Sequence, residues 1–240
     1  MICRGCGEDK KLIKAHIIPE AFFRGLRSDG TPPRLITDIK GIYPRKAPIG
    51  VYDSGILCRS CEDIFEDLDE YGQLALLQNS DSTRELKWGS ELLGYAISGV
   101  DLNYFKKFLL SVLWRASVST HDYYSKVNLG PYEKRVKDIV WADGANIDSS
   151  DFSFVVSKFL DHSFSKAMLD PHPERWHGIN YYRIYMFGYT VHIKVDKRAT
   201  PKMFKNFEQS GSGELFVIAK DMTDSRELNA IISVAGKSVS

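Results

Sequence analysis

Cys3-Arg4-Gly5-Cys6 opens an informative segment that runs to Glu70, and Cys58-Arg59-Ser60-Cys61 lies near its end. All four cysteines of the 240-residue chain belong to these two C-x-x-C pairs. Two thiolates three positions apart on a tight turn can present both sulfur atoms to one point, and two such turns complete a tetrahedral shell for zinc. The spacing favours a fold in which a β-hairpin lies between the first cysteine pair and a helix that carries the second.

Two other roles compete for these cysteines: a pair of disulfides, or redox chemistry at a C-x-x-C motif. The N-terminus lacks the apolar core of a secretion signal and no apolar run reaches membrane-spanning length, so we expect a cytoplasmic protein with no membrane partner. In that setting C-x-x-C pairs indicate a metal site, and no strand–helix context surrounds either pair as redox chemistry would require. We therefore predict a structural Zn²⁺ held by Cys3, Cys6, Cys58 and Cys61.

Charge is distributed unevenly along the chain although its net value is only +1, which gives no general signature of nucleic-acid binding. Residues 1–50 contain ten Lys or Arg against five Asp or Glu, whereas residues 53–70 contain seven carboxylates and one arginine. A metal-dependent phosphodiesterase needs this combination, because cations hold the backbone phosphates and carboxylates hold the metal. A solvated helix face explains the acidic run equally well.

The rest of the chain predicts a mixture of helices and strands. Apolar residues at helical spacing predict helices from Cys61 onward, over 103–116 with Asp101 as N-cap, and over 132–141. Stretches rich in Val, Ile, Phe and Tyr predict strands at 152–159, 181–187, 189–195 and 215–219, with a weaker strand pair at 84–88 and 91–97. We expect an α+β fold in which residues 1–78 form a zinc-bound finger, and residues 79–240 form central helices and a C-terminal antiparallel sheet of unknown role.

Two further groups of polar residues have a competing structural role. Arg115, inside the predicted helix at 103–116, could contact phosphate, but a buried ion pair is the favoured interpretation. His172 and His177 with Glu174 could suggest a second metal site, but a polar loop before a strand accounts for them better.

The first 70 residues resemble the HNH nucleases, which use a ββα-metal finger that many members brace with zinc on two C-x-x-C pairs. In such members a histidine ends the first strand, an asparagine precedes the second pair and a histidine follows it. His16, in Ala-His-Ile-Ile-Pro, matches the first histidine; Asp53 stands where the asparagine is expected and Glu62 where the last histidine is expected. Ala15 is a departure, because many members place a metal ligand directly before the first histidine.

The resemblance implies a treble-clef-like finger and a metal-dependent endonuclease that acts on DNA. His16 would be the general base, Asp53 would orient its ring, and Glu62 would bind a catalytic Mg²⁺ or Mn²⁺ with Glu66 as a second ligand. Phage defence or a mobile element would suit such a protein, and its C-terminal region would set target, partner or oligomeric state. The residues expected to hold phosphates are Arg24, Arg27, Arg34, Lys40, Arg45 and Lys46.

Each catalytic assignment leaves an alternative open. His16 could pack beside the cysteine turns, Glu62 could be an ordinary first-turn carboxylate, and Asp53 could form a turn in Asp-Ser-Gly. The alternative function is a non-catalytic zinc-finger module that binds nucleic acid or a protein partner.

Overall fold

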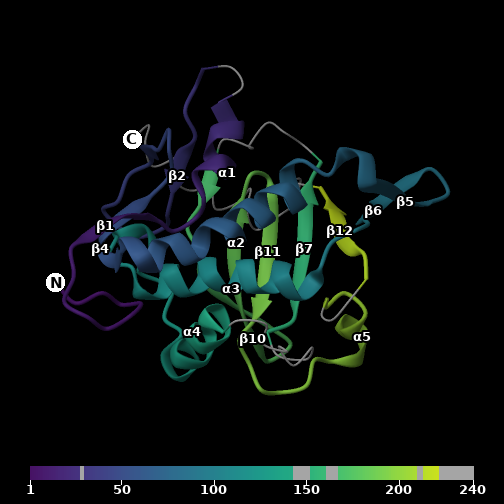
Figure 1. Ribbon diagram of the computed structural model, residues 1–240. Helices are drawn as coiled ribbons and strands as arrows, with labels where there is room; N and C mark the ends of the chain where they lie inside the picture. Colours follow the sequence, from purple (N-terminus) through teal and green to yellow (C-terminus); the bar gives the residue numbers. More distant parts are fainter. Residues whose placement is uncertain (28–29, 143–151, 161–166, 210–212, 222–240) are drawn as a thin grey trace.

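The computed structural model of the protein describes residues 1–27, 30–142, 152–160, 167–209 and 213–221 (Figure 1). Two long helices, α2 (Arg59–Leu77) and α3 (Leu102–Val118), cross one face of a large sheet. The protein is thus a mixed α+β structure with a sheet that is mainly antiparallel, as predicted. In the described part of the chain, no helix combines the length and the apolar character that crossing a membrane requires.

The large sheet has seven strands in the order β5-β6-β12-β7-β11-β10-β9. Every neighbouring pair is antiparallel except β12 with β7, which run parallel. The strands lie close to the predicted bounds, apart from β9, which was expected to be a loop. They are β5 (Thr83–Trp88), β6 (Glu91–Ile97), β7 (Phe154–Phe159), β9 (His172–Trp176), β10 (Ile179–Met186), β11 (Tyr189–Lys194) and β12 (Leu215–Lys220).

The strands predicted at 181–187 and 189–195 form an antiparallel hairpin, β10 and β11, that turns at Phe187 and Gly188. Phe187 and Gly188 have φ angles of 50° and 76°, and two consecutive left-handed residues form the turn that matches strand twist. His177 and Gly178 repeat this geometry between β9 and β10, with φ angles of 45° and 85°. Pro173 did not prevent strand formation, because β9 is the edge strand and its free side needs no N–H donor.

The helices follow the sequence patterns closely. Asp101 caps α3 by accepting hydrogen bonds from the backbone N–H groups of Asn103 and Tyr104, as predicted. Almost all of α3 is buried, because α2 and α4 pack along it and the sheet lies behind it. The remaining helices are α1 (Glu20–Arg24), α4 (Glu133–Trp141) and α5 (Lys202–Lys205).

The N-terminal segment forms a strand–strand–helix unit. β1 (Leu12–His16) pairs antiparallel with β4 (Tyr52–Cys58), and β4 runs directly into α2. The insert between them supplies β2 (Arg34–Ile36) and β3 (Arg45–Lys46), which form a three-stranded sheet with β8 (Ala167–Leu169). One continuous cluster of buried hydrophobic residues extends from Cys3 to Val217, so segments 1–78 and 79–240 share a core.

Candidate functional site

Four cysteine thiols gather where the N-terminal turn meets the start of α2. The sulfur atoms of Cys3, Cys6, Cys58 and Cys61 all lie within 4.8 Å of one another, and 4.0 Å separates Cys6 Sγ from Cys58 Sγ. Zinc–sulfur bonds of about 2.3 Å place tetrahedral sulfurs about 3.8 Å apart, so the spacing fits such a shell. All four cysteines are free, not disulfide-bonded. The cluster can therefore hold a metal ion such as zinc.

The surrounding backbone fits closely around these sulfurs. A Cβ atom at Gly5 would lie 2.7 Å from Cys61 Sγ, so only glycine fits in the first turn. The Cys58 backbone N–H donates to Cys3 Sγ at 3.3 Å, which links the two turns. The Ser60 hydroxyl, 3.3 Å from Cys58 Sγ, lowers the pKa of Cys58 to about 6, and the thiolate is the form that binds metal.

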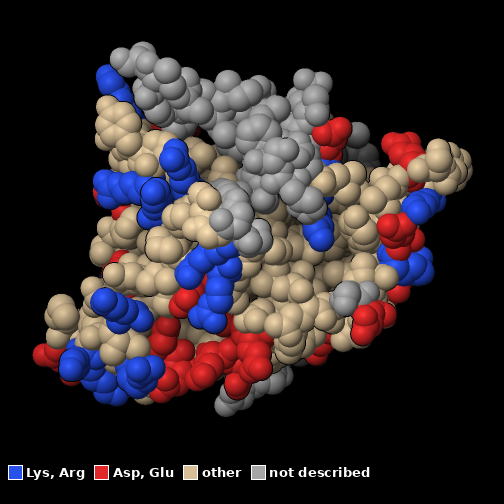
Figure 2. Space-filling view, turned by 90° about the horizontal axis from the view of Figure 1, so that it is seen from above, with Lys and Arg blue, Asp and Glu red and all other residues tan. Residues whose placement is uncertain are grey.

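A groove of about 830 Å³ lies between α1 and α2. His16 lines it from the end of β1, and Glu20 and Arg24 line it from α1. The opposite wall is acidic, and Figure 2 shows a row of Asp and Glu side chains beside groups of Lys and Arg on one face of the molecule. The acidic residues that α2 contributes to the groove are Glu62, Asp63, Glu66, Asp69 and Glu70.

Among the described residues, His16 is the one histidine that lines this groove. It pairs across the strands with Tyr52, whose ring meets the imidazole edge-on with centroids 6.1 Å apart. Burial lowers the pKa of His16, although the negative charge of Glu20 opposes this shift. Nε2 is buried, and no described residue gives it a hydrogen-bond partner. The ring is therefore neutral at physiological pH and retains a nitrogen that can accept a proton.

Glu62 and His16 line the same groove. Burial raises the pKa of Glu62, and the charge of Asp69 adds to this effect, while Arg115 and the His16 backbone N–H oppose it. Oε2 of Glu62 is also buried without a partner among the described residues. The imidazole and the carboxylate, 46 positions apart in the sequence, thus line one groove, as the resemblance implies.

Sequence reasoning predicted an ion pair for Arg115 but missed its partner, Asp69, and its bond to the His16 backbone. Arg115 donates from Nη1 to the His16 carbonyl and to Asp69 Oδ2, each at 2.8 Å, and from Nη2 to Asp69 Oδ1 at 2.5 Å. The buried ion pair expected for Arg115 is confirmed. Asp69 follows Glu62 and Glu66 at helical spacing on α2, which is the signal that could have identified it.

Asp53 does not orient the His16 ring, and the prediction is corrected here. Its carboxylate accepts hydrogen bonds from the Gly55 N–H at 2.7 Å, the Ser119 hydroxyl at 2.9 Å, and the N–H and hydroxyl of Thr120 at 2.7 and 3.0 Å. Burial alone would raise the pKa of Asp53, but these bonds lower it. Asp53 therefore ties β4 to the segment after α3, and its bond to Gly55 is the turn role considered as an alternative.

Glu66 lines the groove one turn after Glu62 and is exposed. Within the described ranges, the cysteine cluster is the only group of three or more His, Cys, Asp or Glu ligand atoms close enough to share an ion. Among the described residues, Glu62 and Glu66 therefore do not meet a third protein ligand.

The predicted phosphate-binding residues are spread over the N-terminal segment. Only Arg24 lines the groove, where it pairs with Glu20 at 3.0 Å; Arg27 lies 3.8 Å from the same carboxylate. The other four are exposed and, within the described part of the chain, form no ion pair: Arg34, Lys40, Arg45 and Lys46.

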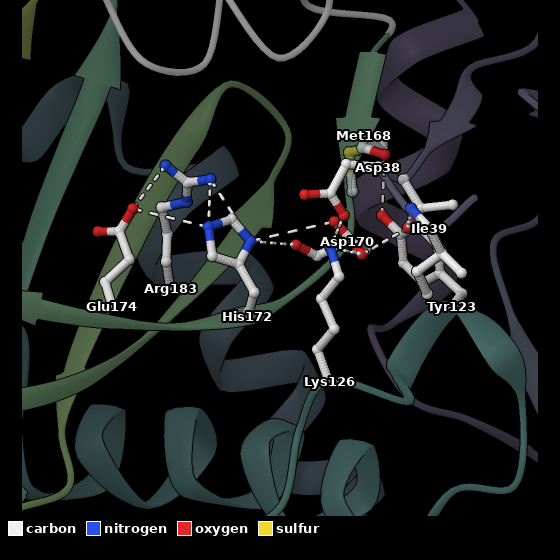
Figure 3. Close-up of polar contacts among 10 residues, drawn as sticks. Asp38, Ile39, Tyr123, Lys126, Met168, Asp170, His172, Glu174 and Arg183 are labelled. Carbon is white, nitrogen blue, oxygen red and sulfur yellow. Dashed lines mark hydrogen bonds and ion pairs between the residues drawn. The ribbon is translucent and has the colours of Figure 1, made fainter. Parts of the chain in front are cut away.

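The polar residues around Glu174 form a structural network (Figure 3). Glu174 pairs with Arg183 at 2.9 Å and with His192 Nε2 at 3.0 Å. His172 Nε2 lies 2.7 Å from Arg183 Nη2, and its Nδ1 lies 3.0 Å from the Asp170 carbonyl. Arg183 thus supplies the positive charge that balances Glu174. His172 and Glu174 lie on β9 rather than in the predicted polar loop, whereas His177 lies in the turn after it.

The cysteine cluster and the groove are built on the same elements. Cys61 and Glu62 are consecutive in the first turn of α2, so the cluster fixes the point from which the acidic wall begins.

Comparison of the chain with protein-family models, with curated proteins and with solved structures finds no match.

Proposed function

We propose that the protein is a metal-dependent endonuclease of the HNH type that hydrolyses phosphodiester bonds in DNA. One observation carries the proposal: His16 and Glu62 line one groove, and each has a buried polar atom, Nε2 and Oε2 respectively, without a hydrogen-bond partner among the described residues. Buried polar atoms are normally satisfied, so two such atoms in one groove favour a bound ion or substrate. The order β1, β4, α2, with four cysteines beside it, supports a zinc-braced ββα-metal finger.

His16 would act as the general base that activates water. Nε2 of the ring has no hydrogen-bond partner among the described residues and could accept the proton. Burial lowers the pKa of His16 and so favours the neutral ring that a base requires. Arg115 holds the His16 carbonyl, so the position of the ring depends on α3.

Glu62, with Glu66, would hold the Mg²⁺ or Mn²⁺. Their carboxylate oxygens are the hard ligands that these ions prefer, and Glu62 offers an unpartnered oxygen. When bound, the ion would stabilise the negative charge that develops on the phosphate and the leaving oxygen. A cation would also favour the ionised form of Glu62, whose pKa burial raises.

The basic residues would bind the DNA backbone at a distance from the reaction. Arg24 lies in the groove, and the exposed cations of the insert have no ion pair within the described residues. Phosphate contacts of this kind position the duplex and make its affinity depend on salt.

A supercoiled-plasmid nicking assay with Mg²⁺ or Mn²⁺ tests this proposal. We expect the wild type to nick the plasmid and His16→Ala to lower the rate by about 10²- to 10⁴-fold, as loss of a general base does. Glu62→Gln should require more metal for the same rate. His121→Asn is the matched control, because His121 lies outside the groove and caps a short turn. No nicking with any divalent ion, or full activity in His16→Ala, would contradict the proposal.

The second candidate is a non-catalytic zinc-finger module that binds nucleic acid or a protein. The observation that favours it is the lack, within the described residues, of a third ligand beside Glu62 and Glu66. A gel-shift assay with the same protein preparations distinguishes the two functions. A non-catalytic module that binds nucleic acid would slow the migration of duplex DNA without nicking it.

A further inference from the structure

A second cavity, of about 360 Å³, lies at the C-terminal end of α2 and shares no lining residue with the groove. Strands β5, β6, β7, β11 and β12 contribute its other walls. Its size falls within the usual range for small-molecule sites. The apolar and aromatic side chains that line it are Leu76, Leu77, Tyr95, Ile97, Tyr189 and Val217.

Lys158 of β7 is the cation in this pocket. Its Nζ lies 5.7 Å from the centre of the Tyr95 ring and 5.2 Å from that of Tyr189. The side chain is half-buried, and burial lowers the pKa of Lys158. No carboxylate in the described part of the chain forms an ion pair with it. The two rings stabilise the charge, but they accept none of the three N–H donors of the ammonium as a carboxylate or phosphate oxygen would.

Several other polar groups in or next to the pocket lining already have partners. Glu85, which also lines the pocket, pairs with Lys87 at 2.5 Å. The last turn of α2 presents carbonyls, but the Tyr189 hydroxyl donates to Leu76 O at 2.9 Å and Asn79 Nδ2 donates to Ala75 O at 3.3 Å. A partner for the ammonium must therefore come from elsewhere.

We propose that this pocket binds a small organic anion, whose carboxylate or phosphate pairs with Lys158 and whose apolar part packs on Leu76, Ile97 and Val217. Removing a charge from water is unfavourable unless a counter-charge or hydrogen bonds replace the water, and an anion supplies both. The apolar walls select a ligand with a hydrophobic body over inorganic phosphate. The inference is independent of the nuclease activity, because none of these residues lines the groove.

Isothermal titration of the full chain at pH 7 with three probes tests the proposal. The probes are 4-phenylbutyrate, phenyl phosphate and the uncharged 4-phenyl-1-butanol. At least one anion should bind about tenfold or more tightly than the alcohol, because a charge-assisted hydrogen bond forms only with the anion. The tighter of the two anions identifies the acid group that the site accepts.

Lys158→Met keeps the length and apolar stem of the side chain and removes its charge, so it should abolish the preference for the anion. Lys158→Arg should retain most of it, and Lys11→Met, an exposed lysine outside the pocket, should leave it unchanged. Thermal melts of each variant confirm that the fold is intact. Equal affinity of the wild type for anion and alcohol, no binding of any probe, or an unchanged preference in Lys158→Met would overturn the proposal.

Discussion

Arg115 has no exposed surface, yet three elements depend on its guanidinium. It donates to the Ser111 carbonyl within α3, forms a two-pronged ion pair with Asp69 of α2, and holds the His16 carbonyl at the end of β1. Burying a charge costs several kcal/mol of desolvation free energy, which such partners offset. The ion pair therefore connects the position of the candidate base to the helical core.

Arg115→Met should lower the free energy of unfolding by about 3–5 kcal/mol, because it leaves the Asp69 carboxylate without its counter-charge. Urea denaturation measures the change. Asp69→Leu combined with Arg115→Met should recover much of the loss, since no unpaired charge then remains. If the double variant is no more stable than Arg115→Met alone, the ion pair does not have the role assigned to it.

His192 of β11 is a buried histidine whose charge the fold disfavours. Burial lowers the pKa of His192 below its ordinary 6.5, although the hydrogen bond and charge of Glu174 on β9 oppose this shift. Arg183 on β10 and Lys220 on β12 add positive charge around the ring and lower the pKa further. Nδ1 of His192 is buried and has no partner among the described residues, so a proton there would be unsatisfied.

We therefore predict a loss of stability below pH 6.5. In that range the unfolded chain binds a proton that the folded chain does not, so the free energy of unfolding falls as pH falls, by at most about 1.4 kcal/mol per pH unit for this one group. Urea denaturation at several pH values measures the slope. His192→Gln can still donate to Glu174 but cannot titrate, and it should flatten the slope. An unchanged slope in this variant would exclude His192 as the cause.

The helix α2 serves three purposes with different faces. Cys61 in its first turn contributes a thiol to the metal cluster, and Glu62 and Glu66 form part of the groove wall. Its buried residues recur every three or four positions and pack on α3; they are Cys61, Phe65, Leu68, Gly72, Ala75 and Leu76. The position of the acids in the groove is therefore fixed by how closely α2 approaches α3.

Gly72 sets that approach, because a Cβ atom there would lie 2.4 Å from the Phe108 ring. Gly72→Ala improves helix propensity by about 1 kcal/mol, but overpacking in a core costs about 1–3 kcal/mol. We expect the clash to prevail and the midpoint of urea denaturation to fall. Adding Phe108→Leu creates space and should restore part of the stability. An increase in stability for Gly72→Ala alone would show that α2 and α3 can separate without cost.

At the scale of the whole molecule, the metal cluster is not an isolated module. Trp141 of α4 packs on Phe65 of α2 and on Trp114 of α3, with ring centroids 5.2 and 4.8 Å away. A Cβ atom at Gly5 would lie 3.1 Å from the Trp141 ring, so the first cysteine turn rests on this aromatic group. Loss of the metal should therefore disturb the shared core as well as the first 70 residues.

Metal analysis should find one zinc per chain, lost in Cys58→Ser. This variant should unfold at lower temperature, with several kcal/mol less stability, because metal-binding free energy contributes to folding. Tryptophan fluorescence and far-ultraviolet circular dichroism should report one shared transition. Cys6→His keeps four ligands at an exposed position and should retain the metal. A wild-type protein without metal, or a Cys58→Ser variant of unchanged stability, would contradict the assignment.

Local patterns in the sequence were sufficient for most elements and for the cysteine cluster. The helix at Leu102–Val118, its Asp101 cap and the strands around Gly188 depend on side-chain periodicity and turn chemistry, which are short-range properties. The thiol spacing within each pair is likewise local. His16 and Glu62 were identified by resemblance, and their shared groove agrees with it.

Tertiary structure decided what local patterns could not. The sequence does not indicate that Asp53 bonds to Ser119 and Thr120, or that Arg115 and Asp69 hold His16, because these partners lie 46 to 99 positions apart. Pro173 predicts a loop from sequence alone, but it lies in an edge strand of the sheet, where a proline is tolerated. Periodicity and spacing determine which surface each segment buries, whereas the partner of a buried charge depends on which segments the core brings together, and that is a property of the folded chain alone.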